Sequence, residues 1–293
     1  MPLASIPDPG QAAWHLGPLS LRAYTLCVIV GILVAIAVAA RRYRDPGVIL
    51  DVAAWAVPFG LLGAAAHAAL DKLKHDFTAH PHLWHAATTA VAAIGVPGAI
   101  VLGAVGAWIA CRRAKIPFAP VAGAAAPAVA FGLAVGGMAH WWAQDFYGRP
   151  ATWWLAERVT PEHRVSGFEN YATFQPAFLY QSIWDVIVGV VTIWAARRFA
   201  LTGERTFLFA AAIYAAGSLW VESIRVGPMP RIFGMPYGAW GDLTVLAVAA
   251  AALYLSRGSR GRRGSQPRPR FNPPRHEPRV PLAGDSPGDV ISL

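Results

Sequence analysis

Polar side chains gather near one end of several long apolar stretches of this sequence. His140 and Asp145 follow one apolar run, Glu222 and Arg225 close another, and Tyr24 opens the first. Imidazole and carboxylate groups can accept and release protons, and a guanidinium group can hold an anion. These residue types, brought together at one level, suit an enzyme that acts on the head group of a lipid.

Other polar residues are expected at the same level. His67 lies near the end of the second apolar run, Tyr180 is at the start of the fifth, and Asp242 opens the last. Each candidate also has a simpler explanation. Tyrosines are enriched at membrane interfaces, a single histidine is usually satisfied by a backbone carbonyl, and a glutamate and an arginine three residues apart on a helix form an ordinary ion pair.

The elements that would position these residues are membrane helices. The chain is 55% hydrophobic and 14% charged, whereas soluble domains carry about 25% charged residues. Its apolar runs are near the length of about 20 residues that crosses a bilayer. We therefore predict an all-α, polytopic membrane protein with seven transmembrane helices. The predicted spans are 22–40, 48–70, 86–111, 119–142, 176–196, 207–224 and 239–255.

Basic residues predict the orientation of these spans. Arginines and lysines follow the first, third, fifth and seventh spans, so the positive-inside rule places the N-terminus outside and the C-terminus in the cytoplasm. The chain then divides into an extracytoplasmic lead (1–21), a seven-helix membrane domain (22–255) and a disordered basic cytoplasmic tail (256–293). The lead has no basic region before an apolar core, so we predict no cleavable signal peptide.

Several other functions are disfavoured. The net charge of +9 is concentrated in the tail and in short loops, so it does not indicate binding to nucleic acid. Four histidines between positions 75 and 85 have no cysteine nearby and no spacing typical of a metal site. Cys27 and Cys111 fall within apolar runs, so we expect no disulfide between them. The lack of an internal repeat argues against a transporter.

Asp185 lies deeper, within the predicted fifth span. A carboxylate that faces lipid at such a depth costs at least about 2.5 kcal/mol. We therefore expect this side chain to face the interior of the helix bundle and to be protonated or hydrogen-bonded.

Four segments carry a family resemblance when they are taken together. They are FQPAFLYQSIWD (174–185), LRAY (21–24), YAAGSLWVESIR (214–225) and AVGGMAHWWAQDFYGRP (134–150). In that order they resemble the motifs Q/H-P-x-x-L-Y-E, I-R-x-Y, Y-x-x-x-R-x-x-x-E-x-x-R and G-R-x-G-N-x-x-N-x-E-x-x-G of the bacterial prolipoprotein diacylglyceryl transferase family. The similarity in order and spacing reaches to about Leu255, and the loops resemble those of actinobacterial members.

The resemblance implies an enzyme of the bacterial cytoplasmic (inner) membrane. It would move the diacylglyceryl group of phosphatidylglycerol to the thiol of the lipobox cysteine in a prolipoprotein signal peptide. Phosphatidylglycerol, this peptide and membrane lipids would be its partners, and no metal or organic cofactor is implied. The implied catalytic residues are Tyr24, His140, Asp145 and His67, with either histidine as the base. The implied phosphatidylglycerol-binding residues are Arg225, Glu222, Gly148, Arg149, Gln175 and Tyr180.

The chain departs from the family motifs at three positions where arginine is expected. These positions hold Ala64, Gly137 and Ser218, and His140 and Asp145 stand where the signature has asparagine and glutamate. One charge-assisted contact in a dry site contributes about 1.5–3 kcal/mol. The alternative is therefore a catalytically impaired family member that binds phospholipid or lipoprotein precursor without turnover.

Overall fold

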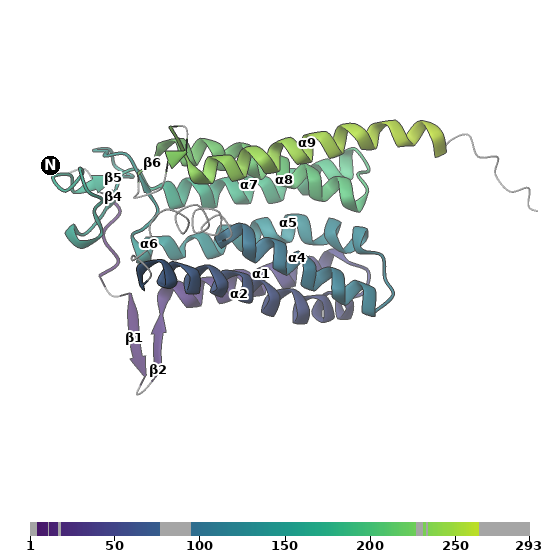
Figure 1. Cartoon of the computed structure of the whole chain (residues 1–293), viewed down its shortest axis with the longest axis horizontal. Coiled ribbons are helices and arrows are strands. Elements are labelled where there is room, and N and C mark those ends of the chain that lie inside the picture. The colour runs from purple at the N-terminus through teal and green to yellow at the C-terminus, as the bar shows by residue number, and fades with distance from the viewer. Residues whose placement is uncertain are drawn as a thin grey trace, which may run out of the picture. The chain divides into compact units, whose positions relative to one another are not determined.

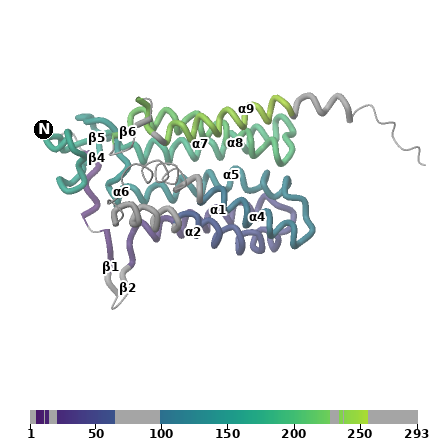
Figure 2. Tube along the Cα trace, viewed as in Figure 1, coloured from purple at the N-terminus to yellow at the C-terminus, as the bar shows by residue number. Residues whose placement is uncertain are grey.

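The computed structural model describes residues 5–10, 12–16, 19–76, 95–226, 231–232 and 234–263 (Figures 1 and 2). The chain separates into two units, 1–255 and 256–293. The first unit holds every element discussed below except the last residues of the final helix. The predicted histidine loop and the start of the predicted third span fall largely within residues 77–94, outside the described residues.

Helices make up most of the described structure, in agreement with the predicted class. They are α1 (Ala23–Arg42), α2 (Pro46–Asp76), α4 (Gly95–Arg113), α5 (Phe118–Gly137), α6 (Ala139–Ala143), α7 (Ala177–Arg198), α8 (Gly203–Ile224) and α9 (Tyr237–Arg263). Within the described ranges, six segments are long and apolar enough to cross a membrane, from α1, α2, α5 with α6, α7, α8 and α9. The prediction of a polytopic helical membrane protein is confirmed at this level.

Several helix bounds differ from the predicted spans. Helix α2 continues to Asp76, past the predicted end at Leu70, because lysine and leucine in this stretch still favour helix after the apolar run ends. Helix α9 likewise continues to Arg263, beyond Leu255. The predicted fourth span is two helices, because the glycine pair before Met138 ends α5 and α6 starts directly after it.

Glycines allow the helices to pack closely. Helix α1 packs along α5, α2 along α4, and α5 also contacts α7 and α8. A Cβ atom on Gly132 of α5 would lie 2.7 Å from the carbonyl oxygen of Gly31 and 2.9 Å from the Cβ of Ala35, both on α1. Small residues at such crossings let helix backbones approach in lipid, where dispersion contacts drive association.

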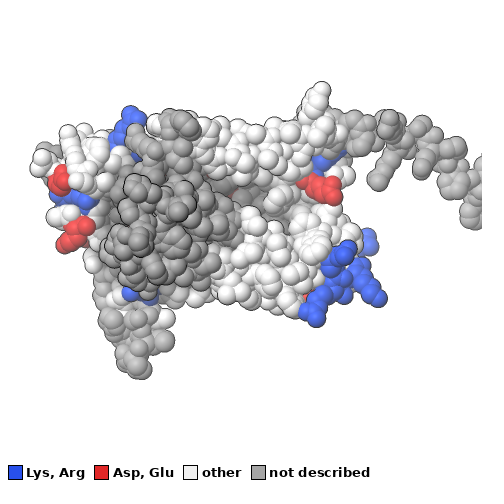
Figure 3. Space-filling view, viewed as in Figure 1, with Lys and Arg blue, Asp and Glu red and all other residues white. Residues whose placement is uncertain are grey.

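Charged side chains lie away from the middle of the helices. On the face shown in Figure 3, the visible Lys, Arg, Asp and Glu side chains are found mainly toward the two ends of the helices. Asp185 of α7 is an exception that is hidden from solvent, with 2% of its surface exposed. Gln181 Nε2 donates a hydrogen bond to Asp185 Oδ1 at 2.9 Å. The expectation that this carboxyl group faces the bundle interior with a hydrogen-bond partner is confirmed.

Short strands join the loops at one end of the helices (Figure 1). They are β3 (Tyr147–Gly148), β4 (Glu157–Arg158), β5 (Thr173–Phe174) and β6 (Arg225–Val226), with the 3₁₀ turn η1 (Pro161–His163) between β4 and β5. Elsewhere β1 (Ala13–Leu16) pairs with β2 (Leu19–Arg22), and β7 (Arg231–Ile232) with β8 (Met235–Pro236).

Backbone pairing connects these strands into one continuous set, which we call the loop ladder. Strand β6 pairs with β3 and β4 pairs with β5. Isolated bridges join Pro150 to Phe174 and Ile6 to Glu157. The loop ladder therefore consists of Ile6, β4, β5 with Gln175, residues 147–150 and β6. It brings together segments that lie before the first helix, after α6, before α7 and after α8.

The crossing of α1 and α5 gives a paired prediction. Gly132→Ala should lower the apparent melting temperature of the purified protein, because its Cβ would meet backbone and Cβ atoms at less than 3.0 Å, and such overpacking costs about 1–3 kcal/mol. Gly136→Ala, one turn further along α5, is the matched control. Its Cβ would meet nothing within 4 Å, so alanine's better helix propensity should leave stability equal or higher. Equal losses in both variants would contradict this packing.

Candidate functional site

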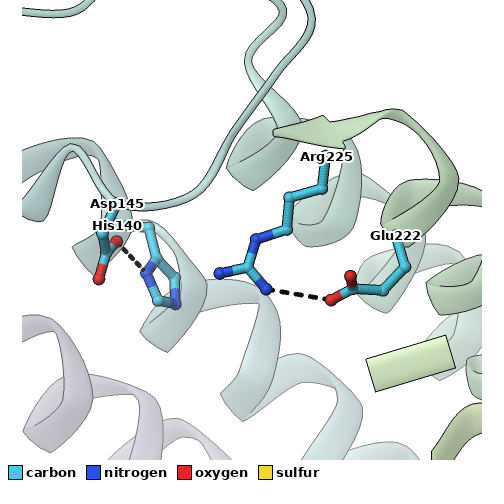
Figure 4. Close-up of polar contacts among 4 residues, drawn as sticks. All are labelled: His140, Asp145, Glu222 and Arg225. Atoms are coloured by element: carbon cyan, nitrogen blue, oxygen red, sulfur yellow. Dashed lines mark hydrogen bonds and ion pairs between the residues drawn. The ribbon is translucent and has the colours of Figure 1, made fainter. Parts of the chain in front are cut away.

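The centre of the site is a contact between His140 and Asp145 at the end of α6. Gln144 adopts the left-handed conformation with φ 50° and ends the helix, and its N–H donates to the carbonyl oxygen of His140 at 2.8 Å. This turn returns the carboxylate of Asp145 to the imidazole, with Oδ1 2.7 Å from Nδ1 (Figure 4). The amide N–H of Thr160 donates to Gln144 Oε1 at 2.8 Å and holds the turn in place.

The charge state of Asp145 sets the direction of this hydrogen bond. Burial alone would raise the pKa of Asp145, but the hydrogen bond and charge of His140 and the charge of Arg225 hold that pKa below its ordinary value. An ionised carboxylate only accepts hydrogen bonds, so Nδ1–H of His140 is the donor. In the neutral imidazole, Nε2 is then the acceptor, and it can take a proton from a nearby nucleophile.

Aromatic contacts link this pair to a cation. The ring of Tyr24, at the start of α1, meets the ring of His140 edge-on with centroids 5.8 Å apart. The ring of His140 also lies 5.1 Å, between centroids, from the ring of Phe146. The guanidinium carbon of Arg225 lies 4.3 Å from the centroid of the same Phe146 ring, within cation–π range. Phe146 therefore places the guanidinium group next to the imidazole.

Arg225 also forms an ion pair with Glu222 at the end of α8. Its Nη1 donates to Glu222 Oε1 at 3.0 Å, as the spacing of three residues predicted. In Figure 4 the guanidinium lies between the imidazole of His140 and the carboxylate of Glu222. Within the described residues, Arg225 Nε and Glu222 Oε2 are buried without hydrogen-bond partners. Arg225 Nε–H is thus an unused donor for an acceptor such as a phosphate oxygen, whereas Glu222 Oε2 is an unused acceptor that only a donor group could satisfy.

The loop ladder fixes the position of Arg225. Gly148 pairs with Arg225 on one side, and on the other its N–H donates to the carbonyl oxygen of Gln175 at 2.7 Å. A Cβ atom on Gly148 would lie 2.9 Å from the Cβ of Gln175 and 3.2 Å from the carbonyl oxygen of Ile224. Only glycine fits here without moving the backbone, so Gly148 acts through spacing rather than through a side chain.

Other predicted site residues lie outside this chain of contacts. The ring of Tyr180 packs on Trp220 with centroids 5.8 Å apart. Arg149 Nη2 donates to the carbonyl oxygen of Ser223 at 3.3 Å and is otherwise exposed. The side chain of His67 is not among the described side chains.

The three positions without arginine have different surroundings. Ala64 is exposed on α2. A Cβ on Gly137 would lie 3.0 Å from the buried hydroxyl oxygen of Ser182. Ser218 of α8 is hydrogen-bonded to Tyr214 and to Asp242. Among the residues that the structure describes, no three His, Cys, Asp or Glu side chains are arranged to hold a metal ion.

Two residues of the site were missed in the sequence. Phe146 joins His140 to Arg225, and Gln144 provides the left-handed turn that returns Asp145 to the imidazole. An aromatic residue directly after Asp145 was a usable signal for the first. No signal marked the second, because a left-handed residue is expected to be glycine or asparagine.

Comparisons with known proteins identify the family of the chain. The sequence model of the family described as prolipoprotein diacylglyceryl transferase matches residues 11–255. A phosphatidylglycerol–prolipoprotein diacylglyceryl transferase of Frankia alni is 38% identical over 88% of this chain and 69% of its own length. One of Streptomyces coelicolor, numbered 2, is 38% identical over 87% of this chain and 82% of its own length. One of Streptomyces avermitilis is 38% identical over 91% of this chain and 78% of its own length.

A match of this extent and relatives of this similarity establish membership. The chain belongs to the prolipoprotein diacylglyceryl transferase family.

Proposed function

We propose that this protein transfers the diacylglyceryl group of phosphatidylglycerol to the lipobox cysteine thiol of prolipoproteins. The observation that carries the proposal is the chain of contacts from Tyr24 through His140 and Phe146 to Arg225, which places a base beside a cation in a family named for this reaction. The proposal includes seven spans in the bacterial cytoplasmic membrane, an outer N-terminus and a cytoplasmic C-terminus. The site then opens toward the extracytoplasmic side.

His140 is the proposed base. Its Nε2 takes the proton of the cysteine thiol, and Asp145 stabilises the resulting imidazolium through Nδ1. The thiolate sulfur attacks the glyceryl carbon that bears the phosphate ester. A carbon–sulfur bond forms, the carbon–oxygen bond to phosphate breaks, and glycerol 1-phosphate leaves with the bonding electrons. The lipobox cysteine supplies the nucleophile, so the protein needs to orient, deprotonate and stabilise charge.

Arg225 is the proposed holder of the phosphate. Negative charge grows on the leaving phosphate as its bond to carbon breaks, and a guanidinium fixed beside the reacting atoms stabilises that charge. Its stacking on Phe146 and its ion pair with Glu222 hold the guanidinium plane in one orientation before substrate arrives. Arg149 supplies a second cation. Its guanidinium donates a hydrogen bond to the carbonyl oxygen of Ser223, which lies two residues before Arg225 in the chain.

The direct test uses the full-length purified protein in vesicles that contain phosphatidylglycerol, with a lipobox peptide as acceptor. Mass spectrometry should detect the thioether-linked diacylglyceryl peptide. Vesicles of phosphatidylethanolamine alone and a peptide with serine in place of the lipobox cysteine are the controls. In cells, the protein should lipidate a reporter precursor in a strain depleted of its own transferase. Failure of both assays with well-expressed, folded protein would contradict the proposal.

Asp145→Asn tests the base. Asparagine cannot stabilise the imidazolium and can turn the imidazole into the wrong tautomer, so the transfer rate should fall by about 10²-fold, within the range of general acid–base catalysis. The exposed carboxylate of Glu162 on η1 provides the matched control, and Glu162→Gln should keep the wild-type rate. A normal rate in Asp145→Asn would remove the pair from the mechanism.

Arg225→Lys tests the phosphate contact. Lysine keeps the charge but loses the planar fork that stacks on Phe146 while it binds Glu222. The loss of one charge-assisted contact, about 1.5–3 kcal/mol, should lower the transfer rate by roughly 10- to 150-fold. Arg158→Lys on the exposed face of β4 is the control with the same chemical change. Equal rates for the two variants would mean that Arg225 does not contact the reacting phosphate.

A second function is favoured by the positions that lack arginine. Gly137 offers no cation, and Ser218 is occupied by internal hydrogen bonds, so fewer positive groups are available for phosphate. In that case the protein binds phospholipid or precursor without turnover. Binding to phosphatidylglycerol vesicles with no thioether product would support this function, and turnover that is lost in Tyr24→Phe would refute it.

A further inference from the structure

The loop ladder includes a carboxyl group that the proposed mechanism does not use. Glu157 is the residue of β4 that lies between two neighbours, paired with Phe174 of β5 on one side and bridged to Ile6 on the other. On the Ile6 side, the N–H of Ile6 donates to the carbonyl oxygen of Ala156 at 2.8 Å, and the N–H of Arg158 donates to the carbonyl oxygen of Ile6 at 3.0 Å. Glu157 therefore sits in the middle of the ladder, not at its edge.

The side chain of Glu157 points to the buried face of this ladder. Residues opposite each other in an antiparallel pair place their side chains on the same face. Phe174, its partner, is fully buried and its ring lies 4.8 Å from the ring of Tyr147. Glu157 itself is only 3% exposed, whereas Arg158, which alternates to the other face, is exposed.

Glu157 has little to stabilise a negative charge. Its Oε1 is buried and has no hydrogen-bond partner among the described residues. The charged or titratable groups that act on it, or on which it acts, are Asp145 before β3, Tyr147 on β3 and Tyr180 on α7. The guanidinium of Arg164 nearby donates instead to the carbonyl oxygens of Val159 and Glu169. An ionised Glu157 would thus be a largely buried anion with one oxygen, Oε1, left without a hydrogen-bond partner among the described residues, and the charge of Asp145 would oppose it.

Burial and the charge of Asp145 together raise the pKa of Glu157 from 4.5 to about 9. The carboxyl group is therefore neutral near pH 7 in the folded protein and ionised in the unfolded chain.

We propose that Glu157 is a positioning residue of this site, which in its uncharged form lets β4 join the loop ladder and so fixes the strand that carries Arg225. The connection runs through backbone pairing from β4 to β5, from there to residues 147–150, and finally to β6. Ionisation of Glu157 would force the carboxylate toward water and would separate β4 from its neighbours. The inference rests on the proposed function only where transfer activity is the readout.

The sign of the expected pH dependence follows from linkage. The folded state holds a proton that the unfolded state releases above its ordinary carboxyl pKa. The stability that depends on neutral Glu157 is therefore complete at acidic pH. It declines as the pH rises from about 4.5 to about 9, and above that range the folded protein carries the buried charge as well.

The test compares four full-length proteins in the same detergent: wild type, Glu157→Gln, Glu157→Leu and Glu162→Gln. Glutamine and leucine cannot ionise, and leucine also guards against an effect specific to the amide. Glu162 is exposed on η1 of the same connecting segment, so its substitution removes a carboxylate with no burial. The apparent melting temperature is measured from about pH 5 to about pH 9, the range over which linkage acts.

As the pH rises, the melting temperature of wild type should fall relative to those of Glu157→Gln and Glu157→Leu. The melting temperature of Glu162→Gln should change with pH as that of wild type does. Hydrogen exchange, compared at one alkaline pH, should be faster at the Ile6 and Arg158 amides of wild type than in Glu157→Gln. The transfer rate of Glu157→Gln should equal that of wild type near neutral pH and should persist to higher pH.

Two results would overturn the inference. One is a melting-temperature difference between wild type and Glu157→Gln that stays constant with pH, which would show that Glu157 is not held neutral. The other is a loss of transfer activity near neutral pH in a stable Glu157→Gln, which would mean that the ionised or proton-donating acid is required. If no protein shows transfer activity but the pH-dependent difference in melting temperature is present, the positioning role stands and the proposed function fails.

Discussion

Backbone groups that are buried away from water must find hydrogen-bond partners, and this requirement shapes the loops at the end of the helices where the site lies. The strands there are only two residues long. Their backbone N–H and C=O groups are satisfied by short pairings and single bridges among the five segments of the loop ladder. The same pairing that satisfies the backbone sets the distance between Arg225 and the end of α6, so the chemical groups are placed by main-chain geometry.

The carboxylates near the loop ladder are unequally paired with cations. Arg225 faces Glu222 directly and also acts on Asp145, while Glu157 lies close to Asp145 without a cation of its own. The guanidinium is held by its ion pair with Glu222 and by its contact with the ring of Phe146, and its charge also acts on Asp145. Phe146 therefore keeps this cation near the imidazole of His140.

Long patterns in the sequence predicted the helices, and short patterns could not predict the ladder. Apolar runs of bilayer length identified the spans, and the three-residue spacing of Glu222 and Arg225 predicted their ion pair. The contact of His140 with Asp145 was not predictable in the same way, because a separation of five residues does not face one side of a helix. It depends on the left-handed turn at Gln144, an uncommon conformation for that residue type.

The burial of Glu157 was even harder to predict from the sequence. Strands of two residues have no detectable alternation, so nothing in the sequence distinguished this buried carboxyl group from the exposed ones that follow it. For Tyr180, the place near the start of α7 could be predicted, but the contact of its ring with Trp220 could not. The position of a residue along a predicted span can be estimated from the sequence. The direction in which its side chain points from the helix depends on the neighbouring helices, which the sequence pattern does not reveal.

The bridge between Ile6 and Glu157 has a consequence for biogenesis. The residues that precede α1 are synthesised first, yet their partner in β4 follows only after α6, and β6 comes later still, after α8. Contacts between such distant positions form slowly and late. A ribosome-bound chain that stops before α8 therefore lacks both Arg225 and β6, so its loop ladder is incomplete.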